Sequence, residues 1–227
     1  MSNKPRQELT KEELRYLRTH DINKLVKITL TEKEKQLLAE INQERERLHL
    51  EKVAALAMAA KPLVDDLRNA GIQIKNGVWD IISDRETCVK VMPVLAAHLE
   101  RDYPPEIQDG IARAMAWPEA LAWRPNFIRL FHQQPFLHDY FRQGLALGIR
   151  NTTGPHNVME TMEILRDRSL GPQRLLIISL FSRVKDEEVR QAILELRDDP
   201  ELSLEIDKLG WVQKLDKESK KVAHPGN

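Results

Sequence analysis

Apolar residues recur at helical spacing in three stretches of the chain that lie roughly 30 to 37 residues apart. The stretches are PPEIQDGIARAMA from Pro104, DYFRQGLALGIR from Asp139 and GPQRLLIISLFS from Gly171. When they are aligned, small or aliphatic residues share positions: Gly110 with Gly144 and Leu175, Ile111 with Leu145 and Leu176, and Met115 with Ile149 and Leu180. The spacing predicts one helix in each stretch, with Leu180 buried between neighbouring helices.

Another amphipathic helix is predicted before each stretch, beginning at Thr87, Pro125 and Asn157. A fourth pair of helices begins at Glu187 and Pro200. Helix pairs that repeat every 30 to 45 residues or so are typical of an α-solenoid, because one pair is too small to bury its apolar face without a neighbour. We therefore predict an all-α fold containing a short α-solenoid of about four helix pairs.

The N-terminal part of the chain predicts a helical arm. TKEE at Thr10 and TEKE at Thr31 both fit the capping box, which satisfies free backbone donors where a helix starts. The first helix should run from Lys11 to about Ile28, and the second from Glu32 to about Ala60. One side of each helix is apolar, through Leu14, Leu17, Leu25 and Ile28 in the first and Leu37, Leu38, Ile41, Leu48 and Val53 in the second. The arm is either a helical hairpin or a coiled coil.

A proline lies near the end of this arm. Because Pro62 would cost ~3 kcal/mol inside a helix, we expect a kink or a new helix start there, with Gly71 as the next C-cap. The Asn-Gly pair in the segment 71–83 permits a hairpin, but a loop with a short helix is favoured. The expected divisions are an arm at 1–70, a connector at 71–83, the helix pairs at 84–210 and a flexible tail at 211–227.

Three segments combine a first helix, a turn with Asp, Pro or Gly, and a second helix with small and aliphatic residues in register. They are MPVLAAHLERDYPPEIQDGIARAMA, MEILRDRSLGPQRLLIISLF and VRQAILELRDDPELSLEI. In this respect residues 84–210 resemble the HEAT-repeat family, in which the second helices line a concave surface. HEAT arrays serve as scaffolds, inhibitors, transport factors and a few enzymes, so the resemblance implies a fold more than a function. The middle repeat departs from the pattern, with WPEALAWRPNF in place of a clean turn and Pro135 near the end of its first helix.

Charge and composition narrow the class of protein. The 227 residues carry 35 basic and 35 acidic side chains, and the segment 88–210 holds 15 basic against 18 acidic, which disfavours a polyphosphate-binding surface. The longest apolar run, VAALAMAA at 53–60, is too short to span a bilayer, and the charged N-terminus does not fit a signal peptide. With one cysteine, no internal disulfide is possible, and we expect a cytoplasmic protein.

Few residues are arranged for chemistry. The seven histidines form neither H-x-x-x-H nor H-E-x-x-H patterns, and the His-Glu dipeptides of a HEAT-like di-iron hydroxylase family do not occur. Cys88 lies in the apolar context ETCVKVMPVL without a nearby histidine, so a buried inert thiol is expected. The tryptophans are expected to link neighbouring repeats, with Trp117 and Trp123 as the exceptions most suited to binding. We expect no metal, no cofactor and no catalysis.

Polar residues recur where the second helices start. Gln108, Arg142 and Gln173 share one aligned position, and Asp109, Gln143 and Arg174 share the next. By the HEAT resemblance these side chains, with Arg113, form a continuous strip on the concave surface. The alternative is that they solvate helix ends or hydrogen-bond to one another. Arg142 and Arg174 are the strongest candidates for partner contacts, because arginine is enriched at interface hot spots.

These observations favour a non-catalytic module that binds another protein, as a scaffold or adaptor. An inhibitor or immunity protein that sequesters a toxin or an enzyme is the alternative within binding. A HEAT-like enzyme that processes nucleic acid is the alternative in another class, and the neutral to acidic array disfavours it. The oligomeric state is left open.

Overall fold

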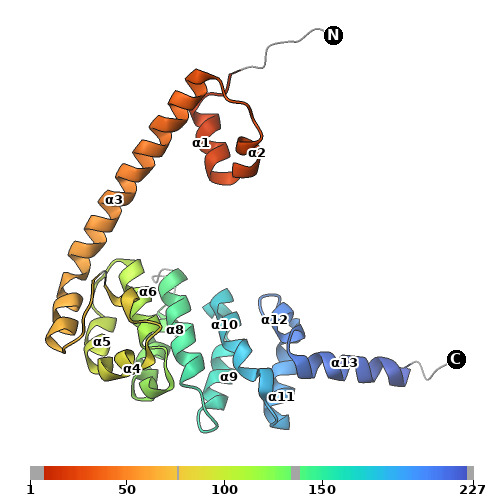
Figure 1. The fold of residues 1–227 in the computed structure, drawn as a ribbon. Coiled ribbons are helices and arrows are strands. Elements are labelled where there is room, and N and C mark those ends of the chain that lie inside the picture. Colours follow the sequence, from red (N-terminus) through yellow and green to blue (C-terminus); the bar gives the residue numbers. More distant parts are fainter. Residues whose placement is uncertain (1–7, 76, 134–138, 224–227) are drawn as a thin grey trace. The chain divides into compact units, whose positions relative to one another are not determined.

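The computed structural model describes residues 8–75, 77–133 and 139–223, with side chains described as far as Lys217. The described residues form helices and turns without a strand, so the all-α class is confirmed (Figure 1). The chain divides into two compact units, Met1–Met58 and Ala59–Asn227. The boundary lies after Met58 and not at the expected residue 70, because the residues that follow it are buried in the second unit.

The first unit contains α1 (Lys11–His20), α2 (Ile22–Val26) and the first part of α3 (Glu32–Asn69). Its core consists of four buried aliphatic residues, Leu14, Leu17, Leu25 and Ile41. All four belong to the apolar sides predicted from the sequence. The first helix, expected to run to about Ile28, is divided at Asp21 into α1 and α2, and α3 continues beyond the expected end at Ala60 to Asn69.

Both predicted capping boxes are present. At α1, Glu13 N donates to Thr10 Oγ1 and Thr10 N donates to the Glu13 carboxylate. At α3, Thr31 N donates to Glu34 Oε2 over 2.7 Å, and Leu9 N donates to the other carboxylate oxygen over 2.7 Å. The fully buried Glu34 therefore joins the start of α3 to the segment before α1.

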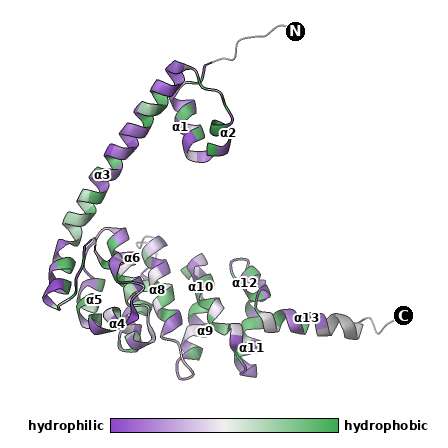
Figure 2. Cartoon of the chain, viewed as in Figure 1, coloured by the Kyte–Doolittle hydropathy of each residue, from purple (hydrophilic) through white to green (hydrophobic). Residues whose placement is uncertain are grey.

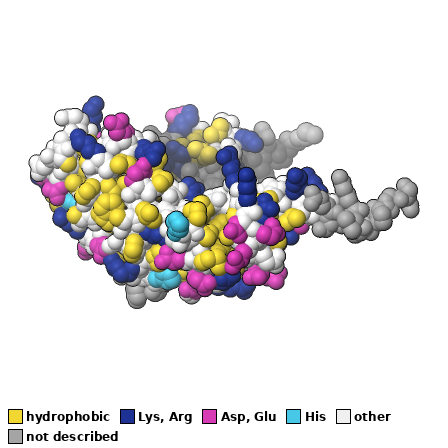
Figure 3. All heavy atoms as spheres, turned by 90° about the horizontal axis from the view of Figure 1, so that it is seen from below, with side chains coloured by type: hydrophobic (Ala, Val, Ile, Leu, Met, Phe, Trp, Pro, Cys, Tyr) yellow, Lys and Arg dark blue, Asp and Glu magenta, His cyan; other side chains and the backbone are white. Residues whose placement is uncertain are grey.

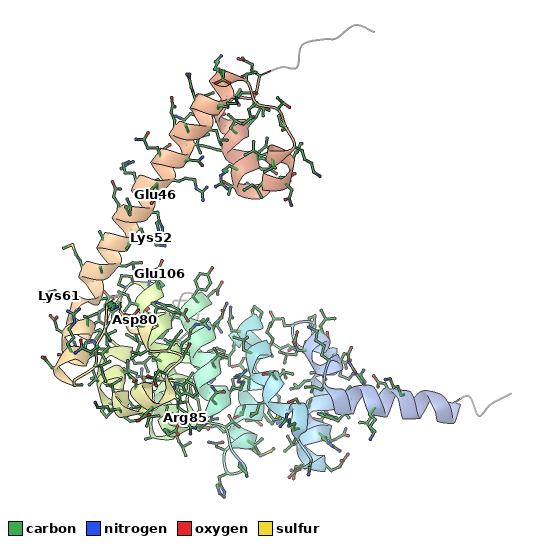
Figure 4. All side chains as sticks on the ribbon, in the orientation of Figure 1. Glu46, Lys52, Lys61, Asp80, Arg85 and Glu106 are labelled. Carbon is green, nitrogen blue, oxygen red and sulfur yellow. The ribbon has the colours of Figure 1, made fainter. Side chains whose placement is uncertain are left out.

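The helix α3 continues through Pro62, so the expected new start is wrong. A proline at this position removes one hydrogen bond, to the carbonyl of Met58. Met58 is 79% exposed, so water can satisfy that carbonyl, while Leu63 and Leu67 beside the proline are fully buried. The burial of Leu63 and Leu67 on one side of the helix thus offsets the hydrogen bond that Pro62 removes on the other side. The apolar run 53–60 forms the green middle of α3 in Figure 2, and the labelled Lys52 and Lys61 project from the helix in Figure 4.

Gly71 ends α3 as predicted. Its φ is +82°, and Ile72 N donates to Leu67 O while Gly71 N donates to Arg68 O, which is the Schellman pattern. The segment that follows contains the 3₁₀ helix η1 (Val78–Asp80), as the preferred interpretation predicted. The connector packs against α6 and belongs to the second unit.

The second unit contains the remaining helices. They are α4 (Arg85–Lys90), α5 (Met92–Leu99), α6 (Pro105–Ala114), η2 (Pro118–Trp123), α7 (Arg124–His132), α8 (Asp139–Asn151), α9 (Val158–Arg166), η3 (Arg168–Leu170), η4 (Pro172–Arg174), α10 (Leu175–Ile178), η5 (Ser179–Arg183), α11 (Glu187–Leu194), η6 (Glu195–Asp198), α12 (Ser203–Asp207) and α13 (Gly210–Ala223). Arg85 of α4, labelled in Figure 4, forms an ion pair with Glu119 of η2. Pro135, which was expected to disturb the middle repeat, lies outside the described residues.

Packing in this unit follows the order of the chain. The helix α6 contacts α8, α8 contacts α10, and α10 contacts α12 (Figure 1). In addition, α5 contacts α6, and α7 contacts α8. Contacts between α9 and α11 connect the last two pairs. The helix α8 therefore has neighbours on several sides and lies at the centre of the unit.

Glycines set how closely α8 approaches its neighbours. A Cβ added at Gly144 would lie 2.7 Å from Ala112 Cβ of α6, and one at Gly148 would lie 2.9 Å from the Phe127 ring of α7. A Cβ at Gly110 would overlap Val78 of η1. The aligned positions of Gly110 and Gly144 therefore correspond to the same kind of close contact, made with different neighbours.

The third aligned stretch departs from the expected register. Leu180 was expected to be buried, but Leu175, Leu176 and Leu180 are only half-buried, while Ile177 and Phe181 are buried. The cause is a change of helix type, because α10 is a short α-helix between two 3₁₀ helices, η4 before Leu175 and η5 after Ile178. About 3.0 residues per turn in a 3₁₀ helix shift the apolar face relative to an α-helix.

The C-terminal segment was expected to be a flexible tail, and this expectation is wrong for the helix α13. Val212 is buried, and the Trp211 indole N–H donates to Phe181 O over 2.9 Å. The Arg190 guanidinium lies 5.3 Å from the centre of the Trp211 ring. Trp211 thus links α13 to the preceding helices, which is the role predicted for the tryptophans.

We expect Gly144→Ala to lower the free energy of unfolding by about 1–3 kcal/mol, because the added methyl group overlaps Ala112 in a packed interface. Intrinsic helix propensity alone would favour alanine by ~1 kcal/mol. The control is Gly210→Ala in α13, where an added Cβ meets nothing within 4 Å. Urea unfolding measures both variants, and a Gly144→Ala protein as stable as the wild type would contradict the close contact of α6 and α8.

Candidate functional site

The structure separates the seven predicted site residues into two groups. Asp109, Arg142, Gln173 and Arg174 are buried, and Gln108, Arg113 and Gln143 are partly exposed. A continuous exposed strip is therefore wrong. The alternative interpretation, in which these side chains hydrogen-bond to one another, agrees with the structure for several of them.

Arg142 of α8 is buried and is not available to a partner. Its Nη1 donates to Gln173 Oε1 over 2.8 Å, and its Nη2 donates to the carbonyl of Leu170. The guanidinium lies 4.8 Å from the centre of the Phe131 ring. Burial lowers the pKa of Arg142, which reflects the cost of holding this charge away from water. The residue connects α8 to the turn that precedes α10.

Arg174 is fully buried in the next junction. Its Nη1 donates to Leu165 O over 2.6 Å and to Asp199 Oδ2 over 2.9 Å, and its Nη2 donates to Glu201 over 2.6 Å. Burial raises the pKa of Asp199, but hydrogen bonds from Arg174 and from Glu201 N together outweigh burial and hold that pKa below its usual value. Arg174 therefore joins the end of α9 to the turn before α12.

Arg124 was not singled out from the sequence, yet it makes the same kind of junction. It is 4% exposed, and it donates to Glu160, to the carbonyl of Ile149 and to Thr161 over 2.8–2.9 Å. The threonines of the NTT stretch provide further acceptors, since Thr153 Oγ1 lies 3.0 Å from Nη1. Two features of the sequence could have indicated this junction. One is an arginine at a helix start, and the other is the threonine-rich turn about one repeat later.

A shallow groove lies over α8, η4 and α10. It is lined by Gln143, Pro172, Gln173, Leu175 and Leu176. Two of these residues were predicted as site residues, whereas the two leucines had been assigned to the core. Both leucines directly follow the 3₁₀ helix η4, whose roughly 3.0 residues per turn shift the apolar face relative to a continuous α-helix and leave them half-exposed. The groove therefore combines amide groups with aliphatic side chains.

Electrostatics beside the groove are balanced. Arg113 Nε donates to Asp109 Oδ1 over 2.7 Å, and Arg113 Nη2 donates to Gln143 Oε1 over 3.3 Å. Burial raises the pKa of Asp109 more than the hydrogen bond from Arg113 lowers it. Above that raised pKa the carboxylate neutralises Arg113, so the groove has hydrogen-bonding groups without a net positive charge.

Other groups with chemical potential are enclosed. Cys88 is fully buried, as predicted, its S–H donates to Ile81 O over 3.1 Å, and burial raises the pKa of its thiol. His98 lies between Tyr103 Oη at 2.6 Å and Asp66 Oδ2 at 2.9 Å, but its ring is completely buried. Buried and hydrogen-bonded within the protein, Cys88 and His98 are placed to stabilise the fold and not to contact a substrate.

No group of three or more His, Cys, Asp or Glu side chains in the described part of the chain is placed to hold a metal ion. None of the described helices combines the length and the apolar composition needed to cross a membrane.

Other exposed apolar side chains of the second unit lie in η2 and α9. Leu121 in η2 is 54% exposed, and Met159 at the start of α9 is 44% exposed. On the face shown in Figure 3, hydrophobic side chains gather in a broad area with charged side chains around it. The groove is the better defined site, since it brings the predicted polar residues Gln143 and Gln173 together with half-exposed leucines.

We expect Arg174→Ala to lower the free energy of unfolding by about 3–5 kcal/mol, because the buried Asp199 would lose its buried ionic partner and keep only the exposed Arg168 at 3.5 Å. Arg183→Ala, at an exposed position, is the control and should stay within about 0.5 kcal/mol of the wild type. Urea unfolding at pH 7 measures both. Equal stability of the two variants would contradict a structural role for Arg174.

The double variant Arg142→Glu and Arg174→Glu should likewise unfold the second unit, because both arginines are buried.

Stability should also depend on pH through Asp199. Its folded-state pKa is lowered, so its contribution is fully present above the ordinary aspartate pKa of about 3.9 and is lost as the pH falls below that value. We expect the urea midpoint of the wild type to fall between pH 5 and pH 3 or so. The drop should be smaller in Arg174→Ala, since burial without the arginine raises the aspartate pKa. An equal drop in both proteins would be the contrary result.

Comparison with known proteins gives no assignment: no protein-family model, no curated protein and no solved structure matches this chain.

Proposed function

We propose that this chain is a non-catalytic protein-binding module, built as a short HEAT-like α-solenoid of about four helix pairs. The successive contacts of α6, α8, α10 and α12 support this architecture, because stacked second helices are the hallmark of such arrays. The first unit is the helical arm of the proposed module, and the cytoplasm is its proposed location. The partner is another protein.

The observation that carries the proposal is the groove over α8 and α10. Half-exposed Leu175 and Leu176 lie beside the amide of Gln143 and the exposed Pro172. Protein interfaces combine an apolar centre with a moderate number of hydrogen bonds, and this groove presents both on rigid helices. The proposed contact residues are therefore Gln143, Pro172, Leu175 and Leu176, with Arg113 beside them. Gln108, which donates to Arg101 O, and the buried arginines are left out.

Charge supports a protein partner over a nucleic acid. Binding to phosphates draws its affinity from several accessible Lys or Arg side chains that release counterions. Beside the groove the charge of Arg113 is paired with Asp109 over 2.7 Å, and Arg142 is buried. The described part of the groove lining contains no lysine or arginine.

Site-specific photo-crosslinking tests this function. A benzophenone amino acid replaces Leu176 in the groove, and a matched protein carries it at Leu204, which is 71% exposed on α12. After irradiation in cells that express the full chain, we expect one protein to crosslink through position 176 and not through position 204. Equal patterns from both positions, or nuclease-sensitive products, would overturn the proposal.

The captured protein should then bind through the same residues. We expect Leu176→Asp to weaken its affinity for the purified chain at least tenfold, or about 1.4 kcal/mol, because the substitution places a charge in the apolar part of the groove. Leu204→Asp serves as the control for added charge and should bind as the wild type does. Calorimetric titration measures both, and thermal melts confirm that both variants fold.

A further inference from the structure

The amide of Gln143 has a fixed orientation. Arg113 Nη2 lies 3.3 Å from the Gln143 side-chain oxygen. A guanidinium has only donors, so the atom of the amide that faces it must be the oxygen. The Gln143 NH₂ group is therefore turned away from Arg113. Within the described residues it donates no hydrogen bond to the protein.

The other amide of the groove is already satisfied. Gln173 Oε1 accepts from Arg142, and Gln173 Nε2 donates to Asp139 over 3.1 Å. Behind it, the buried Arg142 Nε has no hydrogen-bond partner in the described structure. The unmatched groups at and behind this groove are thus donors, and Gln143 presents the one that lines it.

These features define the chemistry of a ligand. Leu175, Leu176 and Pro172 form aliphatic walls, and the groove encloses about 480 Å³ including its open mouth. An apolar side chain of the ligand would pack against these walls. An oxygen of the ligand beside that side chain would accept a hydrogen bond from the Gln143 NH₂ group. Because Asp109 neutralises Arg113, a neutral carbonyl fits better than a phosphate.

We propose that this groove binds an extended peptide segment of the partner, with one apolar side chain against Leu175 and Leu176 and a backbone carbonyl that accepts from Gln143 Nε2. The inference rests on the proposed protein-binding function and specifies its partner. A partner helix fits less well, because its backbone carbonyls are already bonded within the helix, whereas an extended segment leaves them free. Arg113 is the positioning residue that holds the Gln143 amide.

The variant Gln143→Glu removes the donor and adds one negative charge, and the effect of the charge is measured separately by a control. A glutamate keeps the oxygen that accepts from Arg113 and has the same shape, but it lacks the NH₂ group. Gln191→Glu, at an exposed position of α11, makes the same change of charge and is the matched control. Thermal melts of both variants should match the wild type.

The probe is a displayed library of random twelve-residue peptides, selected on the full-length protein. We expect the selected peptides to share one aliphatic or aromatic residue without enrichment of acidic residues. Gln143→Glu should weaken their binding about five- to tenfold, with Gln191→Glu unchanged. Replacing the amide next to the shared residue by an ester, which is a weaker acceptor, should weaken binding to the wild type but not to Gln143→Glu.

The outcomes separate this inference from the proposed function. If a protein crosslinks through position 176 but Gln143→Glu binds it and the selected peptides as tightly as the wild type does, the function stands and the extended-peptide inference fails. Selection of acidic peptides, or of none that depend on Leu176, also overturns the inference. If selected peptides depend on Gln143 but no protein crosslinks through position 176 in cells, the groove chemistry stands and the proposed function fails.

Discussion

A guanidinium group removed from water needs acceptors for its N–H groups, and three arginines of the second unit impose this requirement on the helices around them. Arg124, Arg142 and Arg174 are each at most 4% exposed. Arg124 and Arg174 donate to carbonyls in the last turn of a helix, at Ile149 and Leu165, where the helix itself leaves carbonyls without partners. Each arginine also bonds to a later element. The end of one helix and the start of the next are thereby held at a defined distance.

Close helix contacts complete this framework. The glycines of α8 let α6 and α7 approach to distances that a Cβ would prevent, and the arginines then connect α8 and α9 to the elements after them. The helix α8 is therefore fixed on several sides. Gln143 and the leucines of α10 lie on rigid elements, which is the condition for a groove with a constant shape.

The same framework determines which side chains remain for a partner. Buried ion pairs use Arg174 with Asp199, and Arg113 is paired with Asp109. The groove lining that remains accessible consists of an oriented amide and aliphatic side chains, and it carries no charged residue in the described structure. The proposed preference for a neutral, extended segment follows from this use of charge within the fold.

Local interactions explain what the sequence determined by itself. The capping boxes at Thr10 and Thr31, the Schellman end at Gly71 and the helical spacing of apolar residues all depend on neighbours within a few positions, so they can be read along the chain. The aligned glycines Gly110 and Gly144 were also visible, although their neighbours were not. The all-α class and the apolar sides of the helices in the first unit followed from these signals, whereas the break at Asp21 between α1 and α2 did not.

Only the tertiary structure decided which charged side chains are buried and which residues of the stretch GPQRLLIISLFS face the core. An arginine at a helix start looks the same whether it faces solvent or a buried carboxylate, and the acceptors of Arg174 lie 25 or more residues further along the chain at Asp199 and Glu201. The 3₁₀ helices η4 and η5 on either side of α10 interrupt the expected α-helix and leave Leu175 and Leu176 half-exposed, and burial beside Pro62 kept α3 continuous. In each case contacts distant in sequence outweighed a local preference, which is why the accessible groove could be located only after the fold was known.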